Sequence, residues 1–279
     1  MRYLVTTSPR PSGWRDRRSK PTASLTAYDL YLRALAQSYR YTEEGVAEAV
    51  VLARQALAID PDYTPAAALV SSCQTQQWTQ GWGALSHADI AEACLLARQV
   101  LEAERDDAEA ISQAAWTLFF LAGEGAMAAA AFDRALALNP NAAHAWMHRG
   151  GIYAQRNQPE AAIEALERAR RLSPFDPYTF ICAVNIAMAH LVARRFELAI
   201  EWADRALHDQ PRMVPAMRIK VVALAHLGHL DEARAELSRV LAIYPEQTIA
   251  GLREYFHYLA PEFLELCLTG LRPAGLPEK

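Results

Sequence analysis

Residues 143–174 read AHAWMHRGGIYAQRNQPEAAIEALERARRLSP, and this stretch decides the fold that the sequence predicts. Ala162 and Ala169 lie seven residues apart, so they share one face of a helix. Their small side chains let this helix lie close to the one before it, where Gly150 permits a close crossing. The helix ends at Pro174, because proline lacks an amide hydrogen and clashes with the preceding turn. The stretch therefore predicts two short helices packed as a pair.

The end of this second helix recurs along the chain. The prolines that follow such helix ends are Pro61, Pro140, Pro174, Pro211 and Pro245, and Arg105 takes the proline's place in a sixth copy. From Pro140 onward the prolines are 34, 37 and 34 residues apart. The gap from Pro61 to Arg105 is 44 residues, which predicts an insertion of about ten residues within residues 77–89.

Small residues recur at two fixed positions in each copy. Twelve residues before the proline, or before Arg105, the residue is alanine, and five residues before it the residue is alanine or valine. These positions are Ala49, Ala56, Ala93, Val100, Ala128, Ala135, Ala162, Ala169, Ala199, Ala206, Ala233 and Val240. Because the two positions of a copy share one helix face, the sequence predicts a close helix contact in all six copies.

The 34-residue period and the stretch 143–174 resemble the tetratricopeptide repeat. Its signature positions hold Trp146, Gly150, Tyr153, Ala162, Ala169 and Pro174. The stretch departs at Arg149, where leucine is usual, and at Leu166, where phenylalanine is usual. The resemblance covers roughly residues 27–245, strongly in the second helices and unevenly in the first. It implies an all-α fold, a right-handed α-solenoid of about six helix pairs whose first helices line a concave face.

Three parts are expected along the chain. Residues 1–24 form a flexible basic arm, residues 25–245 the repeat array, and residues 246–279 a capping helix pair with a tail, broken near Pro261. Six basic residues and one acidic residue give residues 1–22 a charge of +5, and the net charge of −4 then leaves −9 for the rest. Two roles stay open for the arm: a solvated chain end, or contact with membrane phosphates or nucleic acid.

The composition indicates a globular protein, with 52% hydrophobic and 22% charged residues. The chain has no apolar run of about 18 residues and no secretory signal at its N-terminus, so we expect a cytoplasmic protein without a membrane span. A pI near 6.1 gives no support to nucleic acid as a partner. Four cysteines without C-x-x-C spacing are expected to be reduced core thiols, namely Cys73, Cys94, Cys182 and Cys267.

Two segments resemble a narrower group of proteins. They are RRSKPTASLTAYDLYLRALA at residues 17–36 and LTGLRPAGLPEK at residues 268–279. Both resemble the C-terminal half of bacterial multidomain proteins that join a class III adenylate/guanylate cyclase domain, or a winged-helix DNA-binding domain, to tetratricopeptide repeats. The resemblance covers the chain after about residue 15, and the residues before it hold no metal-binding aspartate pair. The resemblance therefore implies the repeat half of such a regulator, without its catalysis.

No pattern of a catalytic or cofactor site is present. The sequence has neither a phosphate-binding nor a dinucleotide-binding glycine motif, and no serine stands in a G-x-S-x-G turn. His144 and His148 have the spacing of two zinc ligands on a helix, but no glutamate follows the first and no third ligand is evident. Two groove or surface imidazoles explain them better. We expect no metal, no cofactor and no enzymatic activity.

The register of the repeat implies which side chains line the concave face. They are Arg33, Gln37, Arg40, Ser72, Thr75, Gln76, Trp116, Phe119, Phe120, His144, Met147, Gln155, Met188 and Arg218. The mixture of polar, basic and aromatic residues suits a peptide with an apolar anchor and a nearby acidic group. The alternative for Trp116, Phe119 and Phe120 is an ordinary core between helices, because one residue of register turns a helix by about 100°.

The sequence thus predicts a non-catalytic scaffold that binds a peptide or a partner domain in its concave groove. The narrower resemblance implies the regulatory part of a bacterial signalling protein. Two alternatives stay open. One is the C-terminal portion of a nucleotide cyclase whose catalytic domain is absent here, and the other is a homodimerisation element of a transcription regulator, in which the partner is a second copy of the chain.

Overall fold

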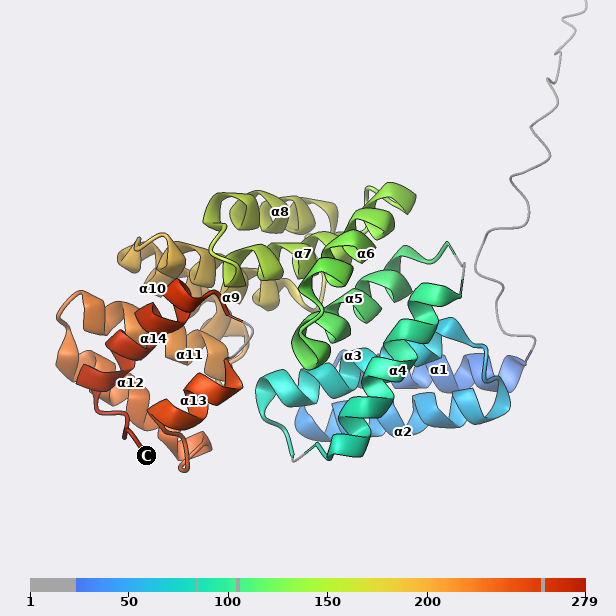
Figure 1. Cartoon of the computed structure of the whole chain (residues 1–279), viewed down its shortest axis with the longest axis horizontal. Helices are drawn as coiled ribbons and strands as arrows, with labels where there is room; N and C mark the ends of the chain where they lie inside the picture. The colour runs from blue at the N-terminus through green and yellow to red at the C-terminus, as the bar shows by residue number, and fades with distance from the viewer. Residues whose placement is uncertain (1–23, 84, 104–105, 257–258) are drawn as a thin grey trace, which may run out of the picture.

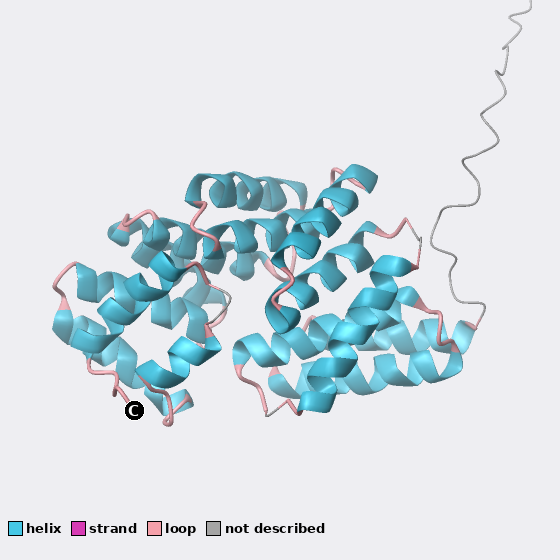
Figure 2. Cartoon of the chain, in the orientation of Figure 1, coloured by secondary structure: helices cyan, strands magenta, loops and turns pink. Residues whose placement is uncertain are grey.

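The computed structural model describes residues 24–83, 85–103, 106–256 and 259–279. Within these ranges all regular secondary structure is helical (Figure 2). Apart from Ser24, the basic arm expected at residues 1–24 lies outside the described residues, as does Arg105.

The helices of the described ranges form six consecutive antiparallel pairs and a C-terminal cap (Figure 1). The pairs are α1 (Leu25–Ser38) with α2 (Glu43–Ile59), α3 (Thr64–Gln80) with α4 (His87–Glu102), α5 (Ala108–Ala122) with α6 (Gly125–Leu138), α7 (Ala143–Gln155) with α8 (Pro159–Leu172), α9 (Thr179–Val192) with α10 (Phe196–Asp209), and α11 (Val214–His226) with α12 (Leu230–Ile243). The cap consists of α13 (Ile249–Tyr255) and α14 (Pro261–Ala274). The predicted all-α solenoid of six pairs with a capping pair is confirmed.

The helix ends follow from local chemistry. Thr42 Oγ1 accepts a hydrogen bond from the amide of Gly45 at 3.1 Å and so caps α2, while Ser86 and Asp89 form a reciprocal capping box at the start of α4. Each of the five repeat prolines lies two residues beyond the last residue of a second helix, as predicted. Pro261 occupies the first turn of α14, where its missing amide hydrogen costs nothing.

The small residues of the repeat lie in the core. All twelve positions named above are at most 3% exposed. At Gly150 a Cβ atom would lie 2.6 Å from Leu166 Cγ on the second helix of the same pair. Leu166, which stands where phenylalanine is usual, therefore fills the space directly above this glycine. The two helices of this pair can approach closely because Gly150 has no side chain and leaves room for Leu166.

The predicted insertion is divided between a helix and a loop. Helix α3 has 17 residues, against 13 to 15 in the other five first helices. Gly81 ends α3 with a positive φ of 66°, a conformation in which glycine carries no steric penalty. The connection then runs to Ser86, the N-cap of α4. The extra turn carries Trp78 and Thr79 beyond the ends of the neighbouring first helices.

This extended end of α3 contacts the C-terminal part of the chain. The hydroxyl of Tyr255 lies 2.9 Å from the carbonyl oxygens of Trp78 and Thr79, and its ring stacks on Trp78 with centroids 4.6 Å apart. The hydroxyl of Tyr244 donates to the carbonyl oxygen of Gln80. Repeat two therefore touches the cap through Tyr255, although 177 and 176 positions separate this residue from Trp78 and Thr79.

A second contact joins repeat one to repeat five. Tyr41, in the loop between α1 and α2, packs edge-on against Phe180 of α9 with ring centroids 4.7 Å apart. It also lies 5.8 Å from the ring of Tyr178, which precedes α9. We call the contacts made by Tyr41, Tyr244 and Tyr255 the closure contacts. They bring the two ends of the array together, so the concave face becomes an interior surface.

Gly150→Ala should lower the free energy of unfolding. The new methyl group overlaps Leu166 Cγ, and overpacking of this kind typically costs about 1–3 kcal/mol, which outweighs the helix propensity gained. Gly251→Ala in α13 is the matched control, because the nearest atom to its Cβ is Thr248 Oγ1 at 3.3 Å. Urea denaturation of both variants checks this. A Gly150→Ala protein as stable as the control would contradict the close crossing.

Replacing Tyr41 and Tyr255 together by alanine should open the array. Each aromatic pair contributes about 0.5–1.5 kcal/mol beyond its buried area, and the hydroxyl contacts of Tyr255 are lost as well. Small-angle X-ray scattering should show a larger radius of gyration at unchanged helix content. Tyr28→Ala on the exposed face of α1 is the control. An unchanged radius in the double variant would mean that other contacts hold the ends together.

Candidate functional site

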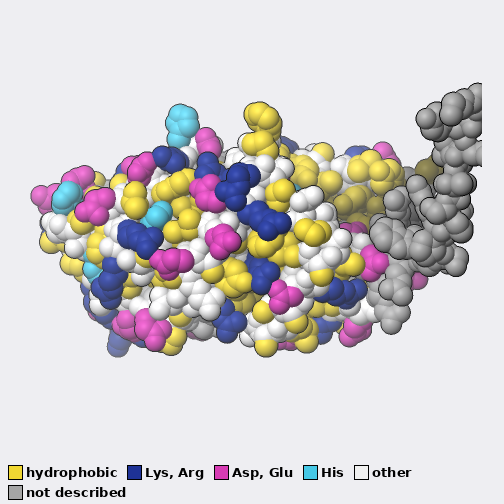
Figure 3. Space-filling model, turned by 90° about the horizontal axis from the view of Figure 1, so that it is seen from above, with side chains coloured by type: hydrophobic (Ala, Val, Ile, Leu, Met, Phe, Trp, Pro, Cys, Tyr) yellow, Lys and Arg dark blue, Asp and Glu magenta, His cyan; other side chains and the backbone are white. Residues whose placement is uncertain are grey.

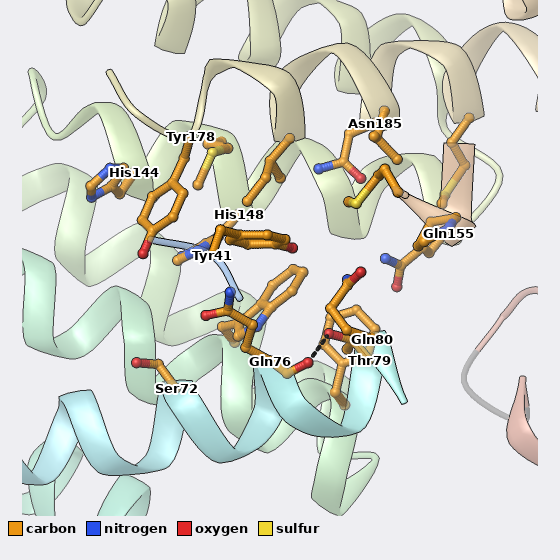
Figure 4. A pocket seen from close by; sticks show the side chains of 18 of the residues that line it. Tyr41, Ser72, Gln76, Thr79, Gln80, His144, His148, Gln155, Tyr178 and Asn185 are labelled. Atoms are coloured by element: carbon orange, nitrogen blue, oxygen red, sulfur yellow. Dashed lines mark hydrogen bonds between the residues drawn. The ribbon is translucent and has the colours of Figure 1, made fainter. Parts of the chain in front are cut away.

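The interior surface encloses a cavity of about 240 Å³. The described residues that line it come from the first helices of all six repeats, from α14 and from connecting loops, and from no second helix (Figure 4). Tyr39 belongs to this lining and is 37% exposed, so the cavity approaches solvent beside it. The cavity is thus the place where all repeats contribute side chains to one space.

Most of the predicted groove residues line this cavity. They are Ser72, Gln76, Trp116, Phe120, His144, Met147, Gln155, Met188 and Arg218. Five others lie elsewhere, namely Arg33, Gln37, Arg40, Thr75 and Phe119. The structure therefore brings nine of the fourteen together, from five different repeats.

The predicted groove residues Arg33 and Gln37 of α1 do not line the cavity, because another side of this helix faces inward. Arg33 pairs with Asp29 at 3.8 Å on the exposed side of α1, and Arg40, just beyond the end of α1, donates to Gln37 Oε1 at 2.9 Å. Tyr31 and Leu35 face the cavity instead. They lie two residues before Arg33 and Gln37, which corresponds to a rotation of about 200°. The basic character predicted for this end of the groove is therefore absent from the α1 contribution to the cavity.

Two further residues of the predicted groove are core residues. Phe119 is 4% exposed and packs in the cluster formed by α5, α6 and α7, one helix position away from Phe120, which does line the cavity. Thr75 is buried between first helices, where its hydroxyl lies 3.0 Å from that of Thr117. Of the three aromatic residues for which a core role was the alternative, only Phe119 has that role alone.

Aromatic rings and methionine form much of the cavity surface. The ring of Trp116 stacks on His148 with centroids 4.8 Å apart and lies 4.3 Å from Phe120. Tyr178 and Tyr41 also line the cavity, with ring centroids 5.8 Å apart, and lie near His144 and His148 (Figure 4). These tyrosines could not be predicted from the repeat register, because they lie in loops outside it.

A charged cluster sits at one end of the cavity. His144 Nδ1 lies 2.8 Å from Glu109 Oε1, and Nε2 lies 3.0 Å from Asp176 Oδ2 in ion-pair contact. Burial by itself would lower the pKa of His144, but the two carboxylates outweigh it and raise the pKa to about 10. The imidazolium in turn lowers the pKa of both carboxyl groups against the opposing effect of burial. At neutral pH the cluster therefore consists of one cation between two anions.

Sequence reasoning missed Glu109 and Asp176. Glu109 and His144 are 35 residues apart, close to one repeat period, so they occupy nearly equivalent positions on successive first helices. That spacing is a signal from which their contact could have been inferred. Asp176 lies in the loop before α9, and loop positions carry no such periodic signal.

His148 is in the opposite state from His144. Burial, with a further contribution from the nearby His144 charge, lowers its pKa to about 4. Its Nδ1 shares a hydrogen bond of 3.1 Å with the hydroxyl of Ser112. His144 directs both ring nitrogens at carboxylates, so the two histidines are not arranged around a common ion. Across the described residues, no group of three or more histidine, cysteine or acidic side chains is placed to hold a metal ion.

The charges of the outer face and the four cysteines show ordinary features. Acidic and basic side chains are interspersed on the outer face (Figure 3), as where Arg195 lies 2.6 Å from Glu160. The four cysteines are buried and unpaired, and burial raises the pKa of Cys73, Cys182 and Cys267 to about 12. In the described ranges no helix is both long enough and apolar enough to cross a bilayer.

Comparison with known proteins identifies the repeat. Residues 118–177 and 184–248 match the family model described as tetratricopeptide repeat. Among curated proteins, the chain is 34% identical over 107 residues to FK506-binding protein-like of Homo sapiens, a match that covers 37% of this chain and 31% of the relative. It is 28% identical over 95 residues to BBSome complex member BBS4 of Mus musculus, covering 34% of this chain and 18% of that one. The chain thus spans less than a third of the length of these curated relatives.

Solved structures show the same architecture at low sequence identity. An IFIT1 monomeric mutant with Gppp-AAAA has a TM-score of 0.65 at 13% identity, covering 90% of this chain and 60% of that chain. The APC/C hetero-tetramer Cut9-Hcn1 has a TM-score of 0.60 at 14% identity, covering 87% and 46%. PilW, a type IV pilus biogenesis factor, has a TM-score of 0.53 at 18% identity, covering 74% and 88%. Residues 118–177 and 184–248 therefore resemble the tetratricopeptide repeat, and the chain has an all-α solenoid fold.

The charged cluster should make stability depend on pH. The folded pKa of His144 lies above its ordinary value of 6.5, so its contribution is complete below about 6.5 and is lost as the pH rises towards about 10. Urea denaturation should show the free energy of unfolding falling across this window by a few kcal/mol at most. In His144→Gln the fall should be absent, whereas the exposed control His229→Gln should retain it. A wild-type protein whose stability is flat across this window would contradict the buried ion pairs.

Proposed function

We propose that this chain is a non-catalytic protein-interaction scaffold. In this proposal the repeat array of residues 25–245 binds a peptide segment or a partner domain at its concave side, and residues 246–279 cap the array. The observation that carries the proposal is the convergence of the first helices of all six repeats on one cavity. Solenoid proteins commonly use such a concave surface for binding.

The chemistry of the cavity supports an apolar anchor from the partner. Trp116, Phe120, Met147 and Met188 belong to its lining, and aromatic and methionine residues are enriched in the cores of protein interfaces. A volume of about 240 Å³ accommodates one large side chain but not a folded segment. We therefore expect one bulky side chain to enter beside Tyr39 while the rest of the partner stays outside.

A protein partner agrees better with this cavity than a nucleic acid. The described lining residues include only Arg218 and His144 as cationic side chains, and His144 is already held by two carboxylates. Phosphate groups need several basic side chains. Two of the similar proteins are, by their names, parts of protein assemblies: a BBSome complex member and the hetero-tetramer Cut9-Hcn1.

The wider setting follows from the narrower sequence resemblance. Residues 17–36 and 268–279 resemble the repeat half of bacterial cyclase-type or winged-helix regulators, which supports a role as the regulatory part of a bacterial signalling protein. A second candidate, contact with another copy of the chain, is favoured by one observation. Leu25, Tyr28 and Leu32 are exposed on one face of α1.

The anchor hypothesis predicts the effect of truncating the cavity surface. A Trp116→Ala/Met147→Ala variant should lose the proteins captured by the wild type, and its affinity for the purified partner should fall at least about tenfold, as for interface hot spots. Leu95→Ala/Met127→Ala removes two exposed side chains from outer helices and should bind normally. Circular dichroism verifies that each variant is folded, and isothermal titration calorimetry measures the affinities. Equal affinity in both variants would place the partner elsewhere.

A further inference from the structure

We propose that residues 173–178, the loop between α8 and α9, form a gate over the cavity, and we call them the gate loop. In the closed state Tyr178 covers the cavity beside Tyr39. The ion pair of Asp176 with His144 keeps it there. This inference goes beyond the scaffold role, because it concerns access to the cavity and can be tested with no partner protein present.

The gate loop is longer than the corresponding connections between other repeats. It has six residues. The connections before α3, α7 and α11 have four residues each, at residues 60–63, 139–142 and 210–213. The two additional residues account for most of the 37-residue spacing between Pro174 and Pro211, which exceeds the repeat period of 34. Because the helix pair does not need them, these residues are free to serve the cavity.

Asp176 attaches the gate loop to the inner layer of helices. Its Oδ2 lies 3.0 Å from His144 Nε2 on α7, and its Oδ1 accepts a hydrogen bond of 2.8 Å from the amide of Tyr178. The side chains of Asp176 and His144 are only 16% and 18% exposed, so water screens their ion pair less than a surface pair. One carboxylate thus binds the helix on one side and fixes the backbone of Tyr178 on the other.

Tyr178 covers the cavity where it approaches solvent. Its ring centroid lies 5.3 Å from that of Tyr39, the half-exposed lining residue, and 5.8 Å from that of Tyr41. It lies equally close, at 5.8 Å, to the ring of His144 (Figure 4). Displacement of Tyr178 would therefore widen the opening of the cavity beside Tyr39.

The rest of the gate loop is weakly attached to the molecule. Pro174, Phe175 and Pro177 are exposed, Phe175 at 97%. In the described part of the chain, the main-chain hydrogen bonds of the loop stay within it or run to α8 and α9. Segments with few buried apolar side chains and few hydrogen bonds to other elements open at the lowest cost. The gate loop can therefore move without unfolding a helix, once Asp176 and Tyr178 are released.

A native thiol reports whether the gate is open. Cys73 lines the cavity from α3 and is 1% exposed. Burial raises the pKa of the Tyr178 phenol, and the nearby Cys73 thiol adds to this effect, so the two groups are close together. Burial also raises the pKa of Cys73 itself to about 12, so this thiol reacts slowly while the cavity is shut. Cys94 on α4 does not line the cavity and serves as the control for unfolding.

The test is the rate at which N-ethylmaleimide labels each cysteine of the full chain at neutral pH, measured by peptide mass spectrometry. Asp176→Asn removes the charge and should speed the labelling of Cys73 about tenfold, with Cys94 unchanged. Glu160→Gln is the matched control, because it removes an ion pair of 2.6 Å with Arg195 on the outer face, and neither rate should change. An unchanged Cys73 rate in Asp176→Asn would overturn the proposal. Equal acceleration of Cys73 and Cys94 would overturn it too, because the ion pair would then stabilise the whole protein rather than a gate.

A double variant tests whether Asp176 acts through Tyr178. Tyr178→Ala removes the ring that covers the cavity and should by itself speed the labelling of Cys73. Adding Asp176→Asn should then increase the rate little further, because the group that Asp176 positions is gone. Circular dichroism verifies that each variant is folded. Effects of the two substitutions that multiply would show that Asp176 does not position Tyr178, and would overturn the role assigned to the ion pair.

Discussion

Each helix pair of this chain depends on two small residues, seven positions apart on the second helix, that let the first helix approach it. Where the pair is tightest, Gly150 faces Leu166 with no room for a methyl group between them. Close packing within each pair makes it a compact unit, and the curvature of the array follows from the rotation between successive units. With six pairs the curvature brings the first repeats back to the last, where the closure contacts form.

Closure turns the inner layer from a groove into a cavity and changes the electrostatics of what faces it. Water is largely displaced from around His144 and His148, so two histidines one helical turn apart reach opposite protonation states. His144 is charged because Glu109 and Asp176 outweigh the effect of its burial on its pKa, and His148 is neutral because burial and the His144 charge outweigh the same two carboxylates. The opposite charge states of His144 and His148 are thus consequences of the closure of the array.

The periodic part of this structure could be predicted from the sequence, because proline and alanine at fixed spacing determine where second helices end and how closely they pack. The first helices could not be placed as well. Their repeat signature is weak outside residues 143–174, so the side of α1 that faces inward differed by two residues from the expected one, and Phe119 was not separable from Phe120. Tyr41, Tyr178 and Asp176 lie in loops, and contacts between distant repeats leave no periodic trace in a single sequence.

The extended end of α3 has a consequence for how such a protein can change over evolutionary time. An open solenoid gains or loses a repeat with little effect on the others, because each repeat touches only its neighbours. Here Trp78 must meet Tyr255, and Tyr41 must meet Phe180. Duplication or deletion of a single helix pair would move one member of each contact by a whole repeat and separate them. The closure contacts therefore constrain the number of repeats in the array.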